Sequence, residues 1–281
     1  MGSREVKRIV TGVRTTDGAG VRLVRVIGHD DVADFDPFLM LDAFDSADPN
    51  DYVKGFPWHP HRGIETVTYL IQGAIEHGDS LSNKGMIRDG CCQWMTAGSG
   101  IIHQEMPQAS PRMLGLQLWI NLPKKYKMTA PQYRDLTPDR IPLVRQGGAA
   151  VAVVAGQYEE AEGVTQGDYV PATLLDVQLD AGRRWALPTK PEDKVFLYVV
   201  EGSGTVGAGE TMVSHHQAAL LGAGNLLEVA AGAKGIRFII FAGTPLGEPV
   251  AWGGPIVMNT MEELKLAFDE LKKGTFLKHQ Q

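Results

Sequence analysis

Two histidines one residue apart, His59 and His61, lie in the stretch GFPWHPHRGIETVTYLIQG and could share one chemical task. Side chains at positions i and i+2 of a β-strand point to the same face, so both imidazoles can bind one ion. His103 and Glu105, in SGIIHQEMPQ, repeat this spacing. Two such pairs on different strands predict a single site with three imidazoles and one carboxylate.

This ligand set suits a divalent first-row metal, and we predict Fe(II), because four protein ligands leave two positions for water, substrate or dioxygen. A closed zinc site would more often contain cysteine. An isolated His-x-His is often only a surface feature, and it is the second pair that favours the metal site. We expect one ion per chain. Ligand type does not decide the metal, so another divalent ion can replace iron in purified protein.

The elements that must position these residues are strands. Short segments rich in Val, Ile, Leu and Tyr alternate with Gly, Asp, Asn or Pro along the chain, which predicts an all-β fold. The segments VTYLIQGAIEHGDS and FLYVVEGSGTVGAG share a layout, and each half then has a Gly-x-Gly before another strand. We predict two similar β-barrels in tandem, a metal-binding barrel over 1–135 and a metal-free barrel over 136–281.

One short helix is predicted at the C-terminus. Thr260 has the type and place of an N-cap, and Glu263 three residues later completes a capping box. The helix should end at Gly274. Its apolar stripe is expected to contain five residues: Met261, Leu264, Ala267, Phe268 and Leu271.

The second half is predicted to lack the metal ligands of the first. Counting from the turn glycines places four residues at the positions of the ligands, namely Pro188, Lys190, Leu227 and Val229. None of these is a good metal ligand. The doublet His215 and His216 would face opposite ways in a strand, so we expect it at the surface.

Composition limits the kinds of partner. The chain has 281 residues, 43% hydrophobic and 21% charged, enough to bury a full core. Its net charge of -6, with no block of like charges, gives no support for direct nucleic-acid binding. No apolar run is long enough to span a membrane, no secretory signal is recognisable, and the adjacent Cys91 and Cys92 indicate no disulfide framework. We expect a cytoplasmic protein, or a nuclear one in a eukaryote.

Four motifs together resemble the pirin family of the cupin superfamily over nearly the whole chain: FPWHPHRGIETVTYLIQG, TAGSGIIHQEMP, LGLQLWINLP and PLGEPVAWGGPIVMNT. The resemblance implies two tandem cupin (jelly-roll) barrels. Carried over position by position, it implies the metal ligands His59, His61, His103 and Glu105, the same four that strand periodicity selects. It also implies that the second barrel holds no metal.

Some pirins have quercetin 2,3-dioxygenase activity, so the resemblance implies a ring-cleaving dioxygenase that opens a flavonol with O2. Glu105 would then both bind the metal and accept the proton of the flavonol 3-hydroxyl as the catalytic base. The alternative is an iron redox-sensing regulator that binds a protein partner, a transcription factor or a metabolic enzyme. An enzyme needs an open pocket and many turnovers per iron, whereas a sensor needs only a metal-linked change in partner affinity.

Side chains around the site have expected roles as well. An apolar wall for a flat aromatic substrate is predicted from Phe56, Trp58, Met95 and Met106. Trp119 is expected in the core. Strand parity would let Glu65 face inward, but the resemblance gives it no ligand role, so we expect it to orient a ligand or to pair with Arg62. We expect His77 to face solvent.

Overall fold

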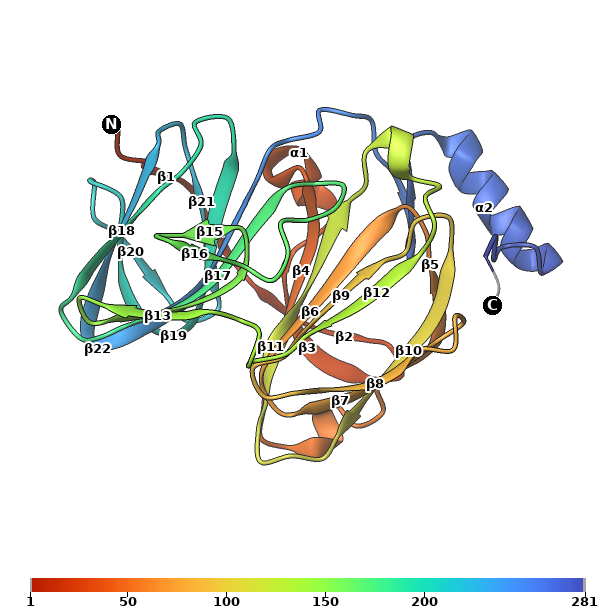
Figure 1. The fold of residues 1–281 in the computed structure, drawn as a ribbon, viewed down its shortest axis with the longest axis horizontal. Coiled ribbons are helices and arrows are strands. Elements are labelled where there is room, and N and C mark those ends of the chain that lie inside the picture. The colour runs from red at the N-terminus through yellow and green to blue at the C-terminus, as the bar shows by residue number, and fades with distance from the viewer. Residues whose placement is uncertain (1, 280–281) are drawn as a thin grey trace. The chain divides into compact units, whose positions relative to one another are not determined.

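The computed structural model describes residues 2–279, and they form two compact β-rich units (Figure 1). We call the unit formed by 14–32, 38–138 and 246–279 the N-unit. The C-unit comprises 2–13, 33–37 and 139–245. Within the described part of the chain, no helix is long and apolar enough to cross a lipid bilayer.

The first strand of the chain belongs to the C-unit and its last segment belongs to the N-unit, in contrast to the expected division into 1–135 and 136–281. We call this arrangement the exchange of chain ends. The central boundary lies close to the expected one, between Pro138 and Asp139. However, strand β1 (Val6–Thr11) pairs with β21 (Gln217–Leu221) and therefore belongs to the C-unit. The last segment of the chain belongs to the N-unit. Backbone pairing between residues far apart in sequence leaves no local pattern, so the ends could not be assigned from sequence.

The N-unit has two large antiparallel sheets, visible on the right of Figure 1. The larger has the order β12-β9-β6-β11-β4-β3-β2, and the smaller has the order β5-β10-β7-β8. The strands of the larger sheet are β2 (Val13–Asp17), β3 (Val21–Ile27), β4 (Phe38–Ser46), β6 (Ile64–Gln72), β9 (Cys92–Thr96), β11 (Met113–Asn121) and β12 (Gln132–Leu136). Those of the smaller sheet are β5 (Phe56–His61), β7 (Ala74–Asp79), β8 (Lys84–Arg88) and β10 (Ile101–Gln108).

The C-unit repeats this topology in one continuous sheet of order β1-β21-β19-β22-β17-β14-β13, in which β18 pairs with β22 and β20 with β19. The long strands β19 (Lys194–Val206) and β22 (Leu226–Gly243) contribute to both layers. The others are β13 (Leu143–Gln146), β14 (Ala149–Ala155), β17 (Ala172–Leu179), β18 (Arg184–Pro188) and β20 (Thr211–Ser214). The predicted all-β fold with an internal repeat is confirmed, but the sheets form jelly-roll sandwiches rather than closed barrels.

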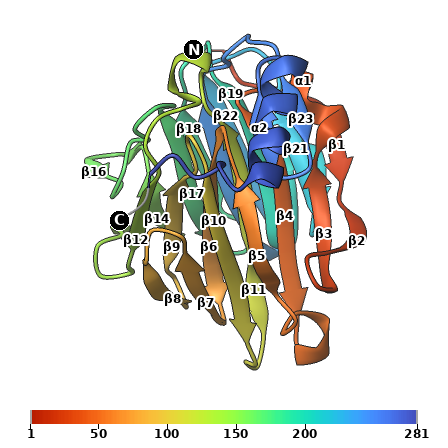
Figure 2. The same ribbon diagram turned by 90° about the vertical axis from the view of Figure 1, so that its right-hand side faces the viewer.

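Short elements complete the chain: η1 (His29–Asp31), α1 (Val32–Phe35), η2 (Pro49–Asp51), η3 (Lys124–Tyr126), β15 (Gln157–Tyr158), β16 (Ala161–Glu162), β23 (Ala251–Gly253), β24 (Ile256–Met258) and α2 (Met261–Lys273). Helix α2 contacts β23 and β24 (Figure 2). Its capping box and its end at Gly274 are as predicted. Leu264 and Ala267 are buried, but Met261, which was expected in the same apolar stripe, is 66% exposed.

The two interiors differ in polarity. The core of the C-unit is a continuous apolar cluster that includes Leu187, Leu227 and Val229. The interior of the N-unit also has apolar clusters, but several titratable side chains are buried beside them: Asp42, His61, Glu65, His77, His103 and Glu105. Burying ionisable groups is unfavourable unless they are paired or bind a metal, so the interior of the N-unit is the candidate for a functional site.

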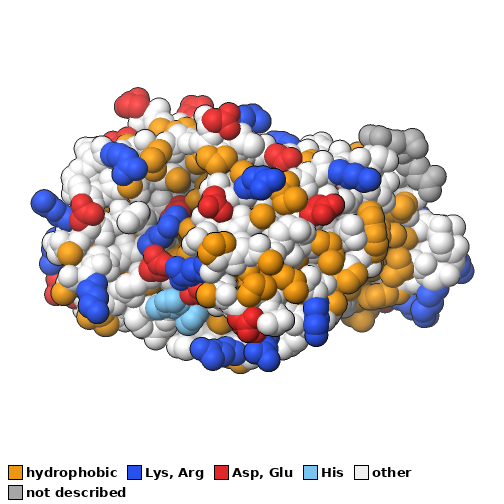
Figure 3. Space-filling view, turned by 90° about the horizontal axis from the view of Figure 1, so that it is seen from below, with side chains coloured by type: hydrophobic (Ala, Val, Ile, Leu, Met, Phe, Trp, Pro, Cys, Tyr) orange, Lys and Arg blue, Asp and Glu red, His pale blue; other side chains and the backbone are white. Residues whose placement is uncertain are grey.

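The surface carries charges of both signs. On the face seen in Figure 3, lysine and arginine side chains are interspersed with aspartate and glutamate, and apolar side chains lie between them. This agrees with the absence of a block of like charges in the sequence.

Lys127 joins three segments of the N-unit. Its side chain is buried, and Nζ donates hydrogen bonds to the carbonyl oxygens of Gly63 (2.8 Å) and Val257 (2.9 Å) and to Oδ1 of Asn121. Burial lowers the pKa of Lys127 from its ordinary 10.5 to about 7. Lys127 links β24 to the loop after β5, and keeping its buried ammonium group charged costs free energy of folding.

Stability should consequently depend on pH through Lys127. Between about pH 7 and pH 10 the unfolded chain binds more protons than the folded one, so the free energy of unfolding should rise with pH, by at most about 1.4 kcal/mol per pH unit. Lys127→Met should lose this rise. Urea denaturation of both proteins across this range measures the difference. An identical pH dependence in the two proteins would show that Lys127 does not lose its proton in the fold.

Candidate metal centre

The register of two strands brings three histidines together. β5 and β10 are antiparallel, with His103 opposite His59 and Ile101 opposite His61. Because side chains alternate along each strand, all three imidazoles enter the same interior. Their ligand nitrogens lie within 4.8 Å of one another. The structure therefore brings His59 and His61 of the first predicted pair together with His103 of the second.

Backbone carbonyls fix the orientation of two of these rings. Nδ1 of His59 lies 2.9 Å from the oxygen of Pro57, and Nδ1 of His61 lies 3.0 Å from the oxygen of Pro255. A carbonyl only accepts, so both Nδ1 atoms carry a proton, and in the neutral form of each ring the lone pair is on Nε2. These two Nε2 atoms face each other at 3.1 Å. Two nitrogens at right angles around one ion, each ~2.1 Å from it, would be ~3 Å apart.

His103 supplies the second indication that the site fits a metal. Its side chain is fully buried, and neither ring nitrogen has a hydrogen-bond partner among the described residues. Burial lowers the pKa of His103 well below its ordinary value, with further lowering from His61 and His59. Burial likewise lowers the pKa of His61 to about 3. His61 and His103 are thus neutral imidazoles, the form that binds metal, and a divalent ion would give one of the two unpaired nitrogens of His103 a partner.

Glu105 lies beside the histidines but outside the set whose ligand atoms lie within 4.8 Å. It is buried, and its carboxylate accepts hydrogen bonds from the Thr68 hydroxyl on β6 (2.9 Å) and from Nε2 of Gln117 on β11 (2.7 Å). These two donors hold the carboxylate in the interior. Its role as fourth metal ligand stays a proposal.

His77 does not face solvent, and that expectation is wrong. It is 1% exposed, lies opposite Glu105 on β7, and its ring centroid is 5.4 Å from that of His103. Its Nε2 approaches Asp79 at 3.4 Å. The signal in the sequence was Ile75, two residues earlier, because an inward Ile75 requires an inward His77.

Arg62 and Glu65 are both buried, but they do not pair with each other. Arg62 donates to the carbonyl oxygens of Ser99 and Phe276 and forms an ion pair with Glu270 of α2. Glu65 accepts a hydrogen bond from Thr96, and burial raises its pKa. Arg62 thus ties the C-terminal segment to the end of β5. The acid that pairs with Arg62 in place of Glu65 is Glu270, which lies on a helix that local sequence could not place nearby.

A pocket of about 540 Å³ opens onto His59 and His61. Of the predicted wall residues, Phe56 lines it. Trp58 is 56% exposed, and Met95 is packed in the core. Met106 also lies outside the lining. A bulge in the pairing of β5 with β10, where Glu105 faces Phe56, shifts the strand phase and turns Phe56 to the same side as the histidines.

Aromatic rings from three distant segments form one wall of this pocket. Trp119 is largely buried, as expected, yet it also lines the pocket, and its ring centroid is 5.0 Å from that of His61. The ring centroids of Trp252 and Trp119 are 5.7 Å apart. The ring of His29 stacks on that of Trp252, with a centroid distance of 3.8 Å and an interplanar angle of 22°. Sequence reasoning missed Trp252 and His29, because neither belongs to the motifs around the ligands.

An ion pair forms the polar side of the pocket. Arg25 donates two hydrogen bonds to Asp42, from Nε (2.9 Å) and Nη2 (2.7 Å), and a third to Asp17 (2.8 Å). All three residues line the pocket, as does Gln117, the partner of Glu105. The site therefore combines a cluster of three imidazoles, a carboxylate held by two hydrogen bonds and an aromatic wall.

Comparisons with known proteins agree with this architecture. Residues 20–120 match the Pirin family, and residues 174–277 match the Pirin C-terminal cupin domain. A pirin-like protein of Caulobacter vibrioides is 45% identical, covering 97% of this chain and 99% of its own. Human pirin is 39% identical over 97% of this chain and 93% of its own. The crystal structure of a quercetin 2,3-dioxygenase from Acinetobacter baumannii matches with a TM-score of 0.88 and 30% identity, covering 97% of this chain and 98% of that one.

Proposed function

Because the chain belongs to the pirin family, we propose that it is a non-haem Fe(II) protein that opens a flavonol ring with O2, as a quercetin 2,3-dioxygenase does. The observation that carries this proposal is the pocket of about 540 Å³, which joins the histidine set to an aromatic wall. This volume lies within the ~300–1,000 Å³ of small-molecule sites. A structural metal site would need no such opening.

Each side chain has a role in this proposal. His59, His61 and His103 would hold the metal, with Glu105 as the fourth ligand. The bound ion would supply Lewis acidity and redox chemistry toward O2. Glu105 would accept the proton of the flavonol 3-hydroxyl, and its hydrogen bonds from Thr68 and Gln117 keep the carboxylate oriented for this transfer. Similar proteins include a quercetin 2,3-dioxygenase from Acinetobacter baumannii, which supports this substrate class.

The direct test is turnover. The protein is reconstituted with Fe(II) without oxygen, quercetin and O2 are then added, and the loss of flavonol absorbance is followed together with the release of carbon monoxide. We expect many turnovers per iron and carbon monoxide in proportion to flavonol consumed. Full iron occupancy without turnover would exclude quercetin as the substrate.

A redox-sensing regulator is the second candidate. Trp58 is 56% exposed on the strand that bears His59 and His61, so a partner protein could contact a surface directly beside the ligands. The similarity to human pirin is compatible with a protein partner. A partner whose affinity changes between Fe(II) and Fe(III), in the absence of turnover, would favour this role.

Trp252→Ala should weaken the binding of the flavonol more than it slows the reaction. An aromatic stacking contact is worth ~0.5–1.5 kcal/mol, so we expect KM to rise about three- to tenfold with kcat changed less. Steady-state kinetics with quercetin measure both constants.

Trp58→Ala is the matched control, since Trp58 is exposed and does not line the pocket. Its KM should stay at the wild-type value. Equal effects of the two substitutions would show that the wall formed by Trp252 does not contact the substrate.

A further inference from the structure

The C-unit has a pocket of its own, at the position equivalent to the metal pocket. The strand orders of the two units match element by element, so β14, β17, β18 and β22 of the C-unit correspond to β3, β4, β5 and β11 of the N-unit. The metal pocket is lined from β3, β4, β5 and β11. The C-unit pocket is lined from the segment after β14, the start of β17, the end of β18 and the end of β22.

The base of this second pocket is apolar where the first has histidines. In the N-unit His59 faces His103, and at the matching place in the C-unit Leu187 faces Leu227. Both leucines are buried in the apolar core. Counting from the turn glycines had placed Pro188 at the position of His59. The strand pairing shows that Leu187 holds this position instead, one residue earlier, because the loops that follow the two strands differ in length. Any ligand of this pocket must therefore be held by other groups.

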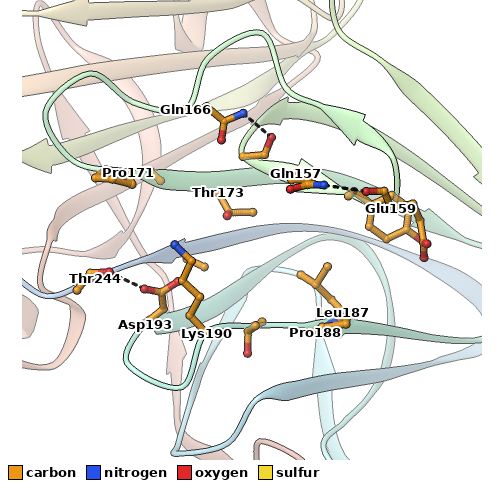
Figure 4. A pocket seen from close by; sticks show the side chains of 15 residues that line it. Gln157, Glu159, Gln166, Pro171, Thr173, Leu187, Pro188, Lys190, Asp193 and Thr244 are labelled. Carbon is orange, nitrogen blue, oxygen red and sulfur yellow. Dashed lines mark hydrogen bonds between the residues drawn. The ribbon is translucent and has the colours of Figure 1, made fainter.

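Polar groups surround the mouth of the pocket. Its volume is about 460 Å³, within the range of small-molecule sites. Lys190, Asp193 and Thr244 lie on one side and Gln157 and Glu159 on the other, as Figure 4 shows. Apolar contacts come from Pro171, Leu187 and Pro188. The lining thus offers one cation, two carboxylates, amides and hydroxyls above an apolar floor.

The rim of the pocket is fixed by its own hydrogen bonds. Nε2 of Gln157 donates to the carbonyl oxygen of Glu159 (3.1 Å), and Nε2 of Gln166 donates to that of Gly156 (3.0 Å). Oδ1 of Asp193 accepts from the Thr244 hydroxyl at 2.7 Å. Glu159 adopts a left-handed conformation with φ of 50°, which is strained for a residue with a side chain. A rim held in this way is preformed for a ligand.

We propose that this pocket binds a neutral polyhydroxylated ligand of the saccharide class. Vicinal hydroxyls both donate and accept, so they can pair with the carboxylates of Glu159 and Asp193 and with the ammonium group of Lys190. The C–H face of a sugar ring can lie on Pro171 and Pro188. Two carboxylates against one ammonium disfavour an anion, and Lys190 disfavours a simple cation. This site is separate from the metal centre and does not depend on the proposed dioxygenase activity.

Binding to the purified full-length chain tests the proposal. Calorimetry with neutral mono- and disaccharides should give saturable binding, and backbone amide NMR should place the shifts at Gly156, Thr173 and Thr244. Glucuronate and glucosamine, which match glucose in ring shape but carry opposite charges, should bind more weakly than the best neutral sugar. The proposal would be overturned if neither glucose nor any other neutral sugar of the panel bound. A clear preference for glucuronate or glucosamine would overturn the ligand class.

Paired substitutions show whether this pocket is the site. Asp193→Asn and Glu159→Gln should each weaken binding about tenfold, the effect of losing one hydrogen bond to a charged group. Their neighbours Glu192→Gln and Glu160→Gln are the controls, since both residues are exposed and outside the lining. The melting temperatures of all four variants should stay close to the wild-type value. Equal affinities of pocket and control variants would place the sugar elsewhere and contradict the assignment.

Discussion

Replacing His103 with alanine is expected to abolish metal retention, from about one ion per chain to a small fraction of that. His103 is fully buried and neither of its ring nitrogens has a hydrogen-bond partner among the described residues, so its loss removes one member of the three-histidine set. Loss of a group that merely supports a ligand typically costs ~10–100-fold in metal affinity, and loss of a ligand should cost more. The metal content of protein purified after Fe(II) reconstitution measures the effect.

His77→Ala is the control for this experiment. His77 is equally buried and only 5.4 Å from His103 between ring centroids, yet it lies outside the three-histidine set. The variant should keep its metal, and circular dichroism should show the β fold in both proteins. A full metal equivalent in His103→Ala, or loss of metal in His77→Ala, would contradict the assignment of the centre.

Glu105→Gln is expected to lower flavonol turnover by ~10²–10⁴-fold, the usual contribution of a general base. Glutamine has the same shape and its carbonyl oxygen still accepts a hydrogen bond, so the fold should persist. The amide cannot take up the substrate proton, and it is a weaker ligand than a carboxylate. Turnover is therefore measured per bound iron, with the iron content determined in parallel.

Thr68→Val separates the proton-accepting role from the role of the hydrogen-bond network. It removes one donor to the Glu105 carboxylate, at 2.9 Å, and leaves the carboxylate itself. We expect a much smaller loss of turnover and unchanged metal content. If Glu105→Gln turned over at the wild-type rate per iron, another group would have to accept the proton.

The sequence predicted the parts of the site that depend on strand alternation. The i, i+2 spacing of His59 and His61, and the placement of His103, follow from the period of a strand, and the structure brings these three together. The all-β fold and the C-terminal helix with its capping box follow from equally local rules. Each of these predictions needed only residues close in sequence.

The features that sequence did not predict depend on contacts between distant segments. Trp252 reaches the pocket from the last part of the chain, and no periodicity relates it to His61. Arg62 pairs with Glu270 rather than with the nearby Glu65, because α2 packs against the N-unit. The inward turn of Phe56 results from a bulge in the pairing of two strands. A one-dimensional pattern carries no information on any of these.

The exchange of chain ends has a consequence for how the protein is made. The carbonyl of Pro255, which orients His61, lies 194 residues after it in the chain. The hydrogen-bond partners of Arg62 on Glu270 and Phe276 are likewise synthesised more than 200 residues after it. A ribosome therefore synthesises the histidine motif long before the segment that completes its surroundings. We expect stable metal loading to follow the synthesis of residues 255–276, and fragments that stop near residue 135 to be poor substitutes for the whole protein.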